Sequence, residues 1–134
     1  MQWVVQKQDT GRVLALWDRW QKLGERVVAP PLFKSEVGNI LHQLVTRDKI
    51  TLVDAADIIG VLEATVAIVS PAGLYERAVS LASELDISFF NDAVYITLAE
   101  TEKCAMWTAD RRLYWSVKER VNNIYSVGDI GSQG

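Results

Sequence analysis

The chain has 134 residues, of which 49% are apolar and 23% are charged. This length and balance are typical of one globular domain with its own core and are too small for two domains. The net charge of −3 and the pI near 5.1 argue against a protein that coats DNA through a basic surface. They do not exclude an enzyme that acts on nucleic acid through a bound metal, because the metal supplies positive charge.

The sequence gives no sign of a membrane span or of secretion. No apolar run approaches the roughly 20 residues that cross a bilayer, and the first residues lack the layout of a signal peptide. Cys104 is the only cysteine, so an internal disulfide is impossible and a reducing compartment is the simple interpretation. We therefore expect a soluble, cytoplasmic protein. A catalytic role for Cys104 is disfavoured, because the only histidine, His42, is far away in the sequence.

Helical and strand patterns alternate from the beginning of the chain. A helix is predicted to open near Asp9 and to stop at Gly24, and a short buried strand follows at Val27–Ala29. Pro31 then suits the first turn of another helix. The apolar side of that helix is predicted to consist of Phe33, Val37, Ile40, Leu41, Leu44 and Val45.

The second half of the chain continues this alternation. Thr51 and Asp54 form the pattern of a capping box, which opens a helix with Ala55, Ile58, Ile59 and Leu62 facing inward. The remaining elements are predicted as a strand at 66–69, helices at 74–85 and 91–102, a strand at 104–108, a helix at 111–120 and a strand at 124–127.

Together these patterns predict a single α/β domain over residues 1–134, with a mostly parallel sheet covered by helices. Four strands and five or six helices are expected. A doubly wound domain of this kind normally opens with a buried strand, whereas this chain opens almost directly into a helix.

Three acidic residues occupy positions at which an ordinary solvent-exposed side chain is not expected. Glu36 lies among apolar residues of the helix that follows the prolines, and Asp92 opens a helix that is otherwise almost wholly apolar. Asp110 directly follows the strand at 104–108, at its carboxyl end, where ligands of open α/β sheets gather. Carboxylate oxygens collected at one sheet edge are the ligands that Mg²⁺ or Mn²⁺ prefers, so these residues are candidate catalytic and metal-binding residues.

Each acid also has a simpler structural explanation. Asp92 could favour a helix N-terminus through the helix dipole, which is worth about 0.3–1 kcal/mol. Asp110 could cap the helix that begins at Arg111. Glu36 could be an ordinary solvated helix position. The metal interpretation gains weight only because the three occur together.

Three segments of the chain, in this order and spacing, resemble the PIN domain family, in particular the VapC-like ribonuclease toxins of toxin–antitoxin pairs. They are Pro31–Leu41, Asn91–Glu100 and Trp107–Leu113. The resemblance covers nearly the whole chain and implies a three-layer sandwich. It also implies an endoribonuclease that cuts single-stranded RNA with Mg²⁺ or Mn²⁺, and a cognate antitoxin as partner.

The resemblance further implies roles for individual residues. Glu36, Asp92 and Asp110 match three acids of the family's metal site. Thr108 matches a hydroxyl residue beside that site, and Asn39 matches a polar residue one turn beyond the glutamate. The cations near these segments could steer phosphate, although an ordinary solvated surface explains them slightly better: Arg111, Arg112 and Lys34.

The departure from the family concerns its first strand and the aspartate at the end of that strand. The pattern that follows this strand in the family begins here at Met1, so we expect an N-terminally shortened domain that lacks this strand. We also expect the sheet to be repaired around the missing position, because leaving it empty would cost about as much as the whole stability of a domain. Asp9 is a poor substitute, because it falls where a helix begins. The vacancy could be closed by direct pairing of the flanking strands, by residues near Trp3, or by a strand from another chain. We favour a homodimer.

Two other functions are compatible with the sequence. A PIN-like module that binds without cleaving would explain the missing aspartate. A receiver-like signalling domain with an acidic pocket would need a later lysine after its phosphorylated aspartate, and no such lysine follows Trp107 at a suitable place. Metal-dependent RNA cleavage would separate the nuclease from the binding module.

Overall fold

The computed structural model of the chain describes residues 2–3, 22–24, 26–108 and 110–126. The elements in chain order are β1 (Gln2–Trp3), β2 (Val27–Ala29), α2 (Leu32–Thr46), α3 (Leu52–Thr65), β3 (Val66–Ile68), α4 (Leu74–Glu84), α5 (Phe90–Thr101), β4 (Met106–Thr108), α6 (Arg111–Val117) and β5 (Ile124–Ser126). Most of the helix predicted to open near Asp9 lies outside the described residues. The predicted stop at Gly24 agrees with its φ of 68°, a left-handed backbone conformation that is typical of glycine at a helix end.

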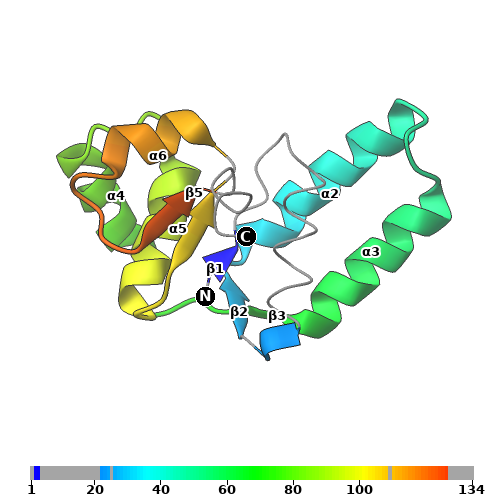
Figure 1. Cartoon of the computed structure of the whole chain (residues 1–134), viewed down its shortest axis with the longest axis horizontal. Helices are drawn as coiled ribbons and strands as arrows, with labels where there is room; N and C mark the ends of the chain where they lie inside the picture. The colour runs from blue at the N-terminus through cyan, green and yellow to red at the C-terminus, as the bar shows by residue number, and fades with distance from the viewer. Residues whose placement is uncertain (1, 4–21, 25, 109, 127–134) are drawn as a thin grey trace.

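The five strands form one parallel sheet in the order β3-β2-β1-β4-β5. Figure 1 shows α2 and α3 on one side of this sheet and α4, α5 and α6 on the other. The prediction of an α/β domain with a parallel sheet between helical layers is therefore confirmed. In the described part of the chain, no helix is long and apolar enough to span a bilayer.

The central position of the sheet is filled by β1, so of the three expected ways to repair the sheet the structure shows the one that uses residues near Trp3. β1 pairs with β2 on one side, through Gln2 opposite Val28, and with β4 on the other, through Trp3 opposite Trp107. An interior gap would leave the backbone polar groups of β2 and β4 unpaired, and the N-terminal residues supply partners for them. The fold needs no strand from another chain to complete this sheet.

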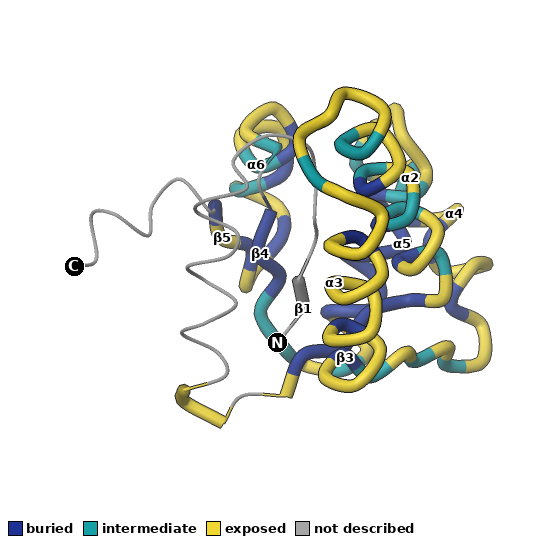
Figure 2. Tube along the Cα trace, turned by 90° about the vertical axis from the view of Figure 1, so that its right-hand side faces the viewer, coloured by how far each residue is buried: buried dark blue, intermediate teal, exposed yellow. Residues whose placement is uncertain are grey.

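Every residue of β2 and β4 is buried, as expected for strands of a parallel sheet that helices cover on both faces. Alternate residues of β2 point to opposite layers. Val27 and Ala29 pack in the core cluster with residues of α2 and α3, whereas Val28 packs with residues of α4 and α5. Figure 2 shows β4 as buried and the outer sides of the helices as exposed.

α5 is the most deeply buried helix that the structure describes. Every residue from Asp92 to Ala99 is buried, as expected for a helix that is apolar almost all round. The only polar side chains in this run are Asp92, Tyr95 and Thr97, and the Thr97 hydroxyl donates to the Ala93 carbonyl at 2.7 Å. A carboxylate in such a helix therefore has to be explained.

The capping box predicted for α3 is present, but the predicted inner face of the helix is only half right. Ala55 and Leu62 are buried, whereas Ile58 and Ile59 are 39% and 38% exposed. Figure 1 shows the α2–α3 hairpin extending away from the sheet, so the helix offers more apolar surface than the core can cover. The large apolar residues that stay exposed on α3 are Leu52, Val53, Ile58, Ile59 and Val61.

Candidate functional site

The topology places the three candidate acids at one edge of the sheet. Glu36 lies in the second turn of α2, which starts just after the carboxyl end of β2. Asp92 lies in the first turn of α5, whose far end leads into the start of β4. Asp110 follows the carboxyl end of β4. The carboxyl ends of parallel strands share one edge, which is where binding sites of open α/β sheets form.

Glu36 and Asp92 lie close enough to influence each other's charge. The pKa of Glu36 is raised above its ordinary value, first by burial and further by the negative charge of Asp92. A hydrogen bond from the Tyr95 hydroxyl to Glu36 Oε1 opposes this rise. Asp92 itself is only 6% exposed. A pair of carboxylates held together in a partly dry site is electrostatically unfavourable unless a cation joins it.

Tyr95 is a site residue that the sequence analysis missed. It lies three residues after Asp92, on the same face of α5, and is 1% exposed. Burial and the neighbouring Glu36 carboxylate raise the pKa of Tyr95, so its hydroxyl stays protonated and donates to Glu36. The signal was a polar hydroxyl one turn from Asp92 in an otherwise apolar helix.

Asp110 caps a helix and is also a candidate metal ligand, so the structural and the functional explanations both apply to it. Its Oδ1 accepts a hydrogen bond from the Leu113 backbone N–H at 3.1 Å and so caps α6. Its own backbone N–H donates to Thr108 Oγ1 at 3.0 Å, and Thr108 is fully buried beside it. The second oxygen, Oδ2, makes no hydrogen bond to any described residue. The cap fixes the side chain and leaves one oxygen available.

A pocket of about 350 Å³ lies between the start of α5 and α6 and joins Asp92 to Asp110. Arg112 lines the same pocket, so one of the three candidate phosphate-steering cations is brought to the acids. Glu36 is not among its lining residues and reaches the site through Asp92. The complete lining is Asp86, Ile87, Ser88, Phe89, Asp92, Asp110, Arg112, Leu113 and Ser116.

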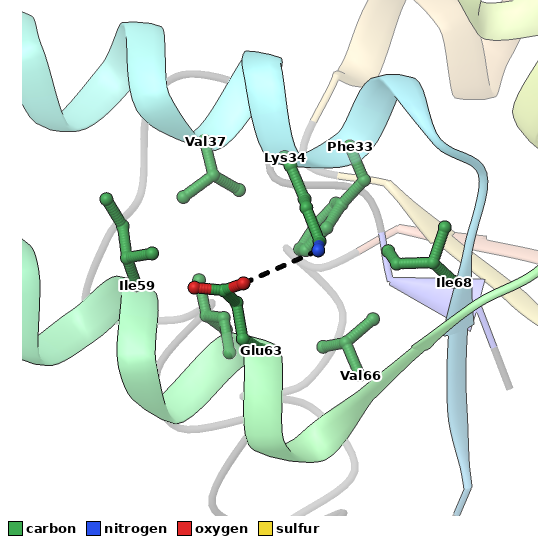
Figure 3. A pocket seen from close by; sticks show the side chains of 8 residues that line it. Phe33, Lys34, Val37, Ile59, Glu63, Val66 and Ile68 are labelled. Carbon is green, nitrogen blue, oxygen red and sulfur yellow. Dashed lines mark hydrogen bonds and ion pairs between the residues drawn. The ribbon is translucent and has the colours of Figure 1, made fainter.

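Other residues considered in the sequence analysis are not brought to this pocket. Lys34 pairs with Glu63 of α3 at 3.4 Å and lines a different cavity, of about 130 Å³, between α2 and α3 (Figure 3). Asn39 and Arg111 are exposed and do not line the acidic pocket. Asp9 lies outside the described residues.

The donor set fits a hard divalent cation more readily than zinc, because every donor is a carboxylate oxygen. In the part of the chain that the structure describes, no group of three or more His, Cys, Asp or Glu side chains is close enough to hold a metal ion jointly. Mg²⁺ usually keeps several waters and takes only one or two carboxylates directly. Asp92 interacts electrostatically with Glu36 and lines the same pocket as Asp110, so a pair that includes Asp92 is the best candidate to supply the ligands that such an ion needs.

No family model matches the chain. Individual relatives, however, agree with a nuclease site. The chain is 33% identical over 90 residues to the VapC ribonuclease Mb0985 of Mycobacterium bovis and to ribonuclease VapC9 of Mycobacterium tuberculosis, which covers 66% of this chain and 68% of each relative.

The fold is also shared with a solved structure. The crystal structure of PAE2754 from Pyrobaculum aerophilum matches 99% of this chain and 97% of its own length, with a TM-score of 0.72 and 21% sequence identity. The predicted PIN-like fold is confirmed by this likeness. The identity to the mycobacterial proteins goes further than the fold, and it shows that this chain belongs to the VapC ribonuclease family.

Proposed function

We propose that this protein is a Mg²⁺- or Mn²⁺-dependent endoribonuclease that cleaves single-stranded RNA and is the toxin of a toxin–antitoxin pair. The observation that carries the proposal is the buried Asp92, which adjoins Glu36 on one side and shares a pocket with Asp110 on the other. Membership of the VapC ribonuclease family supplies the substrate class.

The chain's own residues have separable roles in this proposal. Asp92 is the central metal ligand, with Glu36 and the free oxygen of Asp110 as its neighbours. Tyr95 orients Glu36, and Thr108 orients Asp110. These carboxylates would hold a divalent ion, whose chemistry would be to lower the pKa of a water that attacks phosphorus and to offset charge on the leaving oxygen.

The charge of the pocket supports a requirement for a cation. Its lining carries three carboxylates, Asp86, Asp92 and Asp110, against one cation, Arg112. A polyanionic RNA strand would be repelled from this surface without an added positive charge. The single Arg112 is then available to bind a phosphate of the same strand.

A binding module without nuclease activity is the second candidate. β1 ends at Trp3 and carries no acid, and although three carboxylates line the pocket, no three acids among the described residues are placed to hold one metal ion jointly. Both observations favour weak metal binding and slow cleavage. The exposed apolar residues of α3 support contact with another protein chain. We propose that the antitoxin and a second copy of this chain are the proteins that make such contacts.

The test measures cleavage of a single-stranded RNA by the full chain with Mg²⁺ and with EDTA. We expect Asp92→Asn to lower kcat/KM by about 100- to 1,000-fold, because it removes a charge that stabilises the transition state through the metal. Asp57→Asn, the same chemical change on the exposed face of α3, should keep wild-type activity. Mg²⁺ should also raise the unfolding temperature of the wild type more than that of Asp92→Asn.

Two results would overturn the nuclease. Cleavage that persists in EDTA would exclude the metal mechanism. RNA binding without cleavage at any Mg²⁺ or Mn²⁺ concentration would favour the binding module instead.

A further inference from the structure

An aromatic side chain, Phe89, stands on the rim of the acidic pocket. It is 54% exposed and lines the pocket together with Asp92, which follows it by three residues on the chain. Single exposed apolar residues are common and need no explanation by themselves. Phe89 differs because it borders the two carboxylates and the arginine proposed to handle RNA.

The position of Phe89 is also one where phenylalanine does nothing for the helix. It is the N-cap of α5, with an extended backbone (φ −112°, ψ 109°) and no side-chain capping bond. Ser, Thr, Asn or Asp would stabilise this position, because their oxygens accept from the free backbone N–H groups. The chain thus has an uncapped helix and an exposed ring at the mouth of the pocket.

The next residue, Phe90, provides the contrast. Its ring lies 6.4 Å from the Tyr75 ring of α4, so it has an aromatic neighbour within the chain. It is less exposed than Phe89, at 38%, and does not line the pocket. No ring contact involving Phe89 occurs among the described residues. Two adjacent phenylalanines therefore differ in their neighbours, because Phe90 lies beside the Tyr75 ring and Phe89 lines the pocket.

We propose that Phe89 is a stacking platform for one unpaired base of the RNA substrate, beside the phosphate bound by Arg112. The inference rests on the proposed function and names a substrate-positioning residue for it. A pocket of about 350 Å³ is at the small end of ligand sites, which span about 300–1,000 Å³, and suits one nucleotide rather than a duplex.

Stacking on Phe89 would have two consequences for which RNAs the protein accepts. A base can lie on an aromatic ring only when it is free of its own helix, so the platform selects single strands. Every base has a flat apolar face, so the platform accepts all four with modest preference. Sequence preference must then come from other contacts.

The experiment separates base stacking from a structural role of the ring. Binding of a labelled single-stranded RNA is measured by fluorescence anisotropy with the full chain carrying Asp92→Asn, so that cleavage does not interfere. Adding Phe89→Ser should weaken binding by roughly 5- to 150-fold, the usual effect of removing one base–aromatic stack. Phe89→Trp should bind as well as the parent or better, and Phe90→Leu is the matched control that should not change affinity.

A series of RNAs with one abasic unit at successive positions identifies the stacked base. One position should weaken binding to the parent protein and have no further effect once Phe89 is serine. Additive effects at every position, or unchanged affinity of Phe89→Ser, would overturn the platform while leaving the nuclease intact. Failure of the wild type to bind or cleave any RNA would overturn the nuclease and the platform together.

Discussion

Two of the pockets in the described part of the molecule have contrasting chemistry. The pocket between α5 and α6 is lined by acids, serines and Arg112, with about 350 Å³ of space. The cavity between α2 and α3 holds about 130 Å³ and is lined mainly by apolar side chains, with the Lys34–Glu63 pair bridging the helices (Figure 3). Its apolar lining consists of Phe33, Val37, Ile59, Leu62, Val66 and Ile68.

The contrast shows which of the two pockets has the features of a functional site. In the acidic pocket, side chains that would be costly to bury alone converge from different elements, which is the mark of a functional site. In the apolar cavity, four of the lining side chains belong to the core cluster, and the charged pair lies at the surface. The four are Phe33, Val37, Leu62 and Val66. Substitutions in the acidic pocket should therefore change activity or substrate binding, and substitutions in the apolar cavity should change stability.

The largest effect on stability is expected for Leu62→Ala. Leu62 is 8% exposed and belongs to the core cluster beneath α2 and α3, so its truncation should lower the free energy of unfolding by about 2–5 kcal/mol. Ile59→Ala, at a position 38% exposed, should cost less. Urea denaturation measures both. A loss of cleavage per folded molecule in Leu62→Ala would show that the two pockets are not independent.

The next effect is on the salt dependence of RNA binding, which distinguishes Arg112 from Lys34. If Arg112 contacts one phosphate, Arg112→Ala should flatten the dependence of log affinity for single-stranded RNA on log salt by about 0.7. Lys34→Met should leave this slope unchanged, because Lys34 pairs with Glu63 away from the acidic pocket. Titrations of RNA at several salt concentrations measure the slope. Equal slopes for wild type and Arg112→Ala would remove Arg112 from the site.

A smaller effect concerns the pH dependence of the metal-free protein. Burial and the charge of Asp92 raise the pKa of Glu36 above its ordinary 4.5, so the folded chain holds this proton more tightly than the unfolded chain. The resulting stability is fully present below pH 4.5 and is lost as the pH rises through the folded-state pKa. Glu36→Gln keeps an acceptor for Tyr95 and should be more stable than wild type at neutral pH.

Thermal unfolding in EDTA across this pH range checks the prediction. Glu36→Gln should show a flatter profile than the wild type. The control Glu119→Gln, at a side chain 84% exposed, should follow the wild-type profile. A wild type that becomes more stable as the pH rises through this window, and loses that gain in Glu36→Gln, would contradict the sign.

The smallest effect is expected for the Lys34–Glu63 pair itself. Both side chains are more than half exposed, so the interaction should contribute only about 0–1 kcal/mol. Lys34→Met keeps most of the alkyl stem and removes the charge. A double-mutant cycle with Glu63→Gln isolates the pair, and a coupling well above 1 kcal/mol would mean that it organises the α2–α3 hairpin.

Local features of the fold were predictable because their causes lie within a few residues. The capping box of α3 is present, with Thr51 and Asp54 exchanging hydrogen bonds of 3.0 Å, and the strand at Val27–Ala29 has the predicted bounds. The inward face predicted for α3 was partly wrong at Ile58 and Ile59. Periodicity states which side of a helix is apolar, but only the packing of neighbouring helices decides how much of that side is covered.

The sequence by itself determined the alternation of strands and helices and the identity of the three acids, because residue type and position after a strand are local properties. The tertiary structure alone decided that Tyr95 meets Glu36 across 59 positions of chain, that Lys34 turns to α3, and that Gln2–Trp3 fills the centre of the sheet. Such contacts depend on how helices pack on the sheet and on which backbone groups still need partners. No pattern within one segment contains that information.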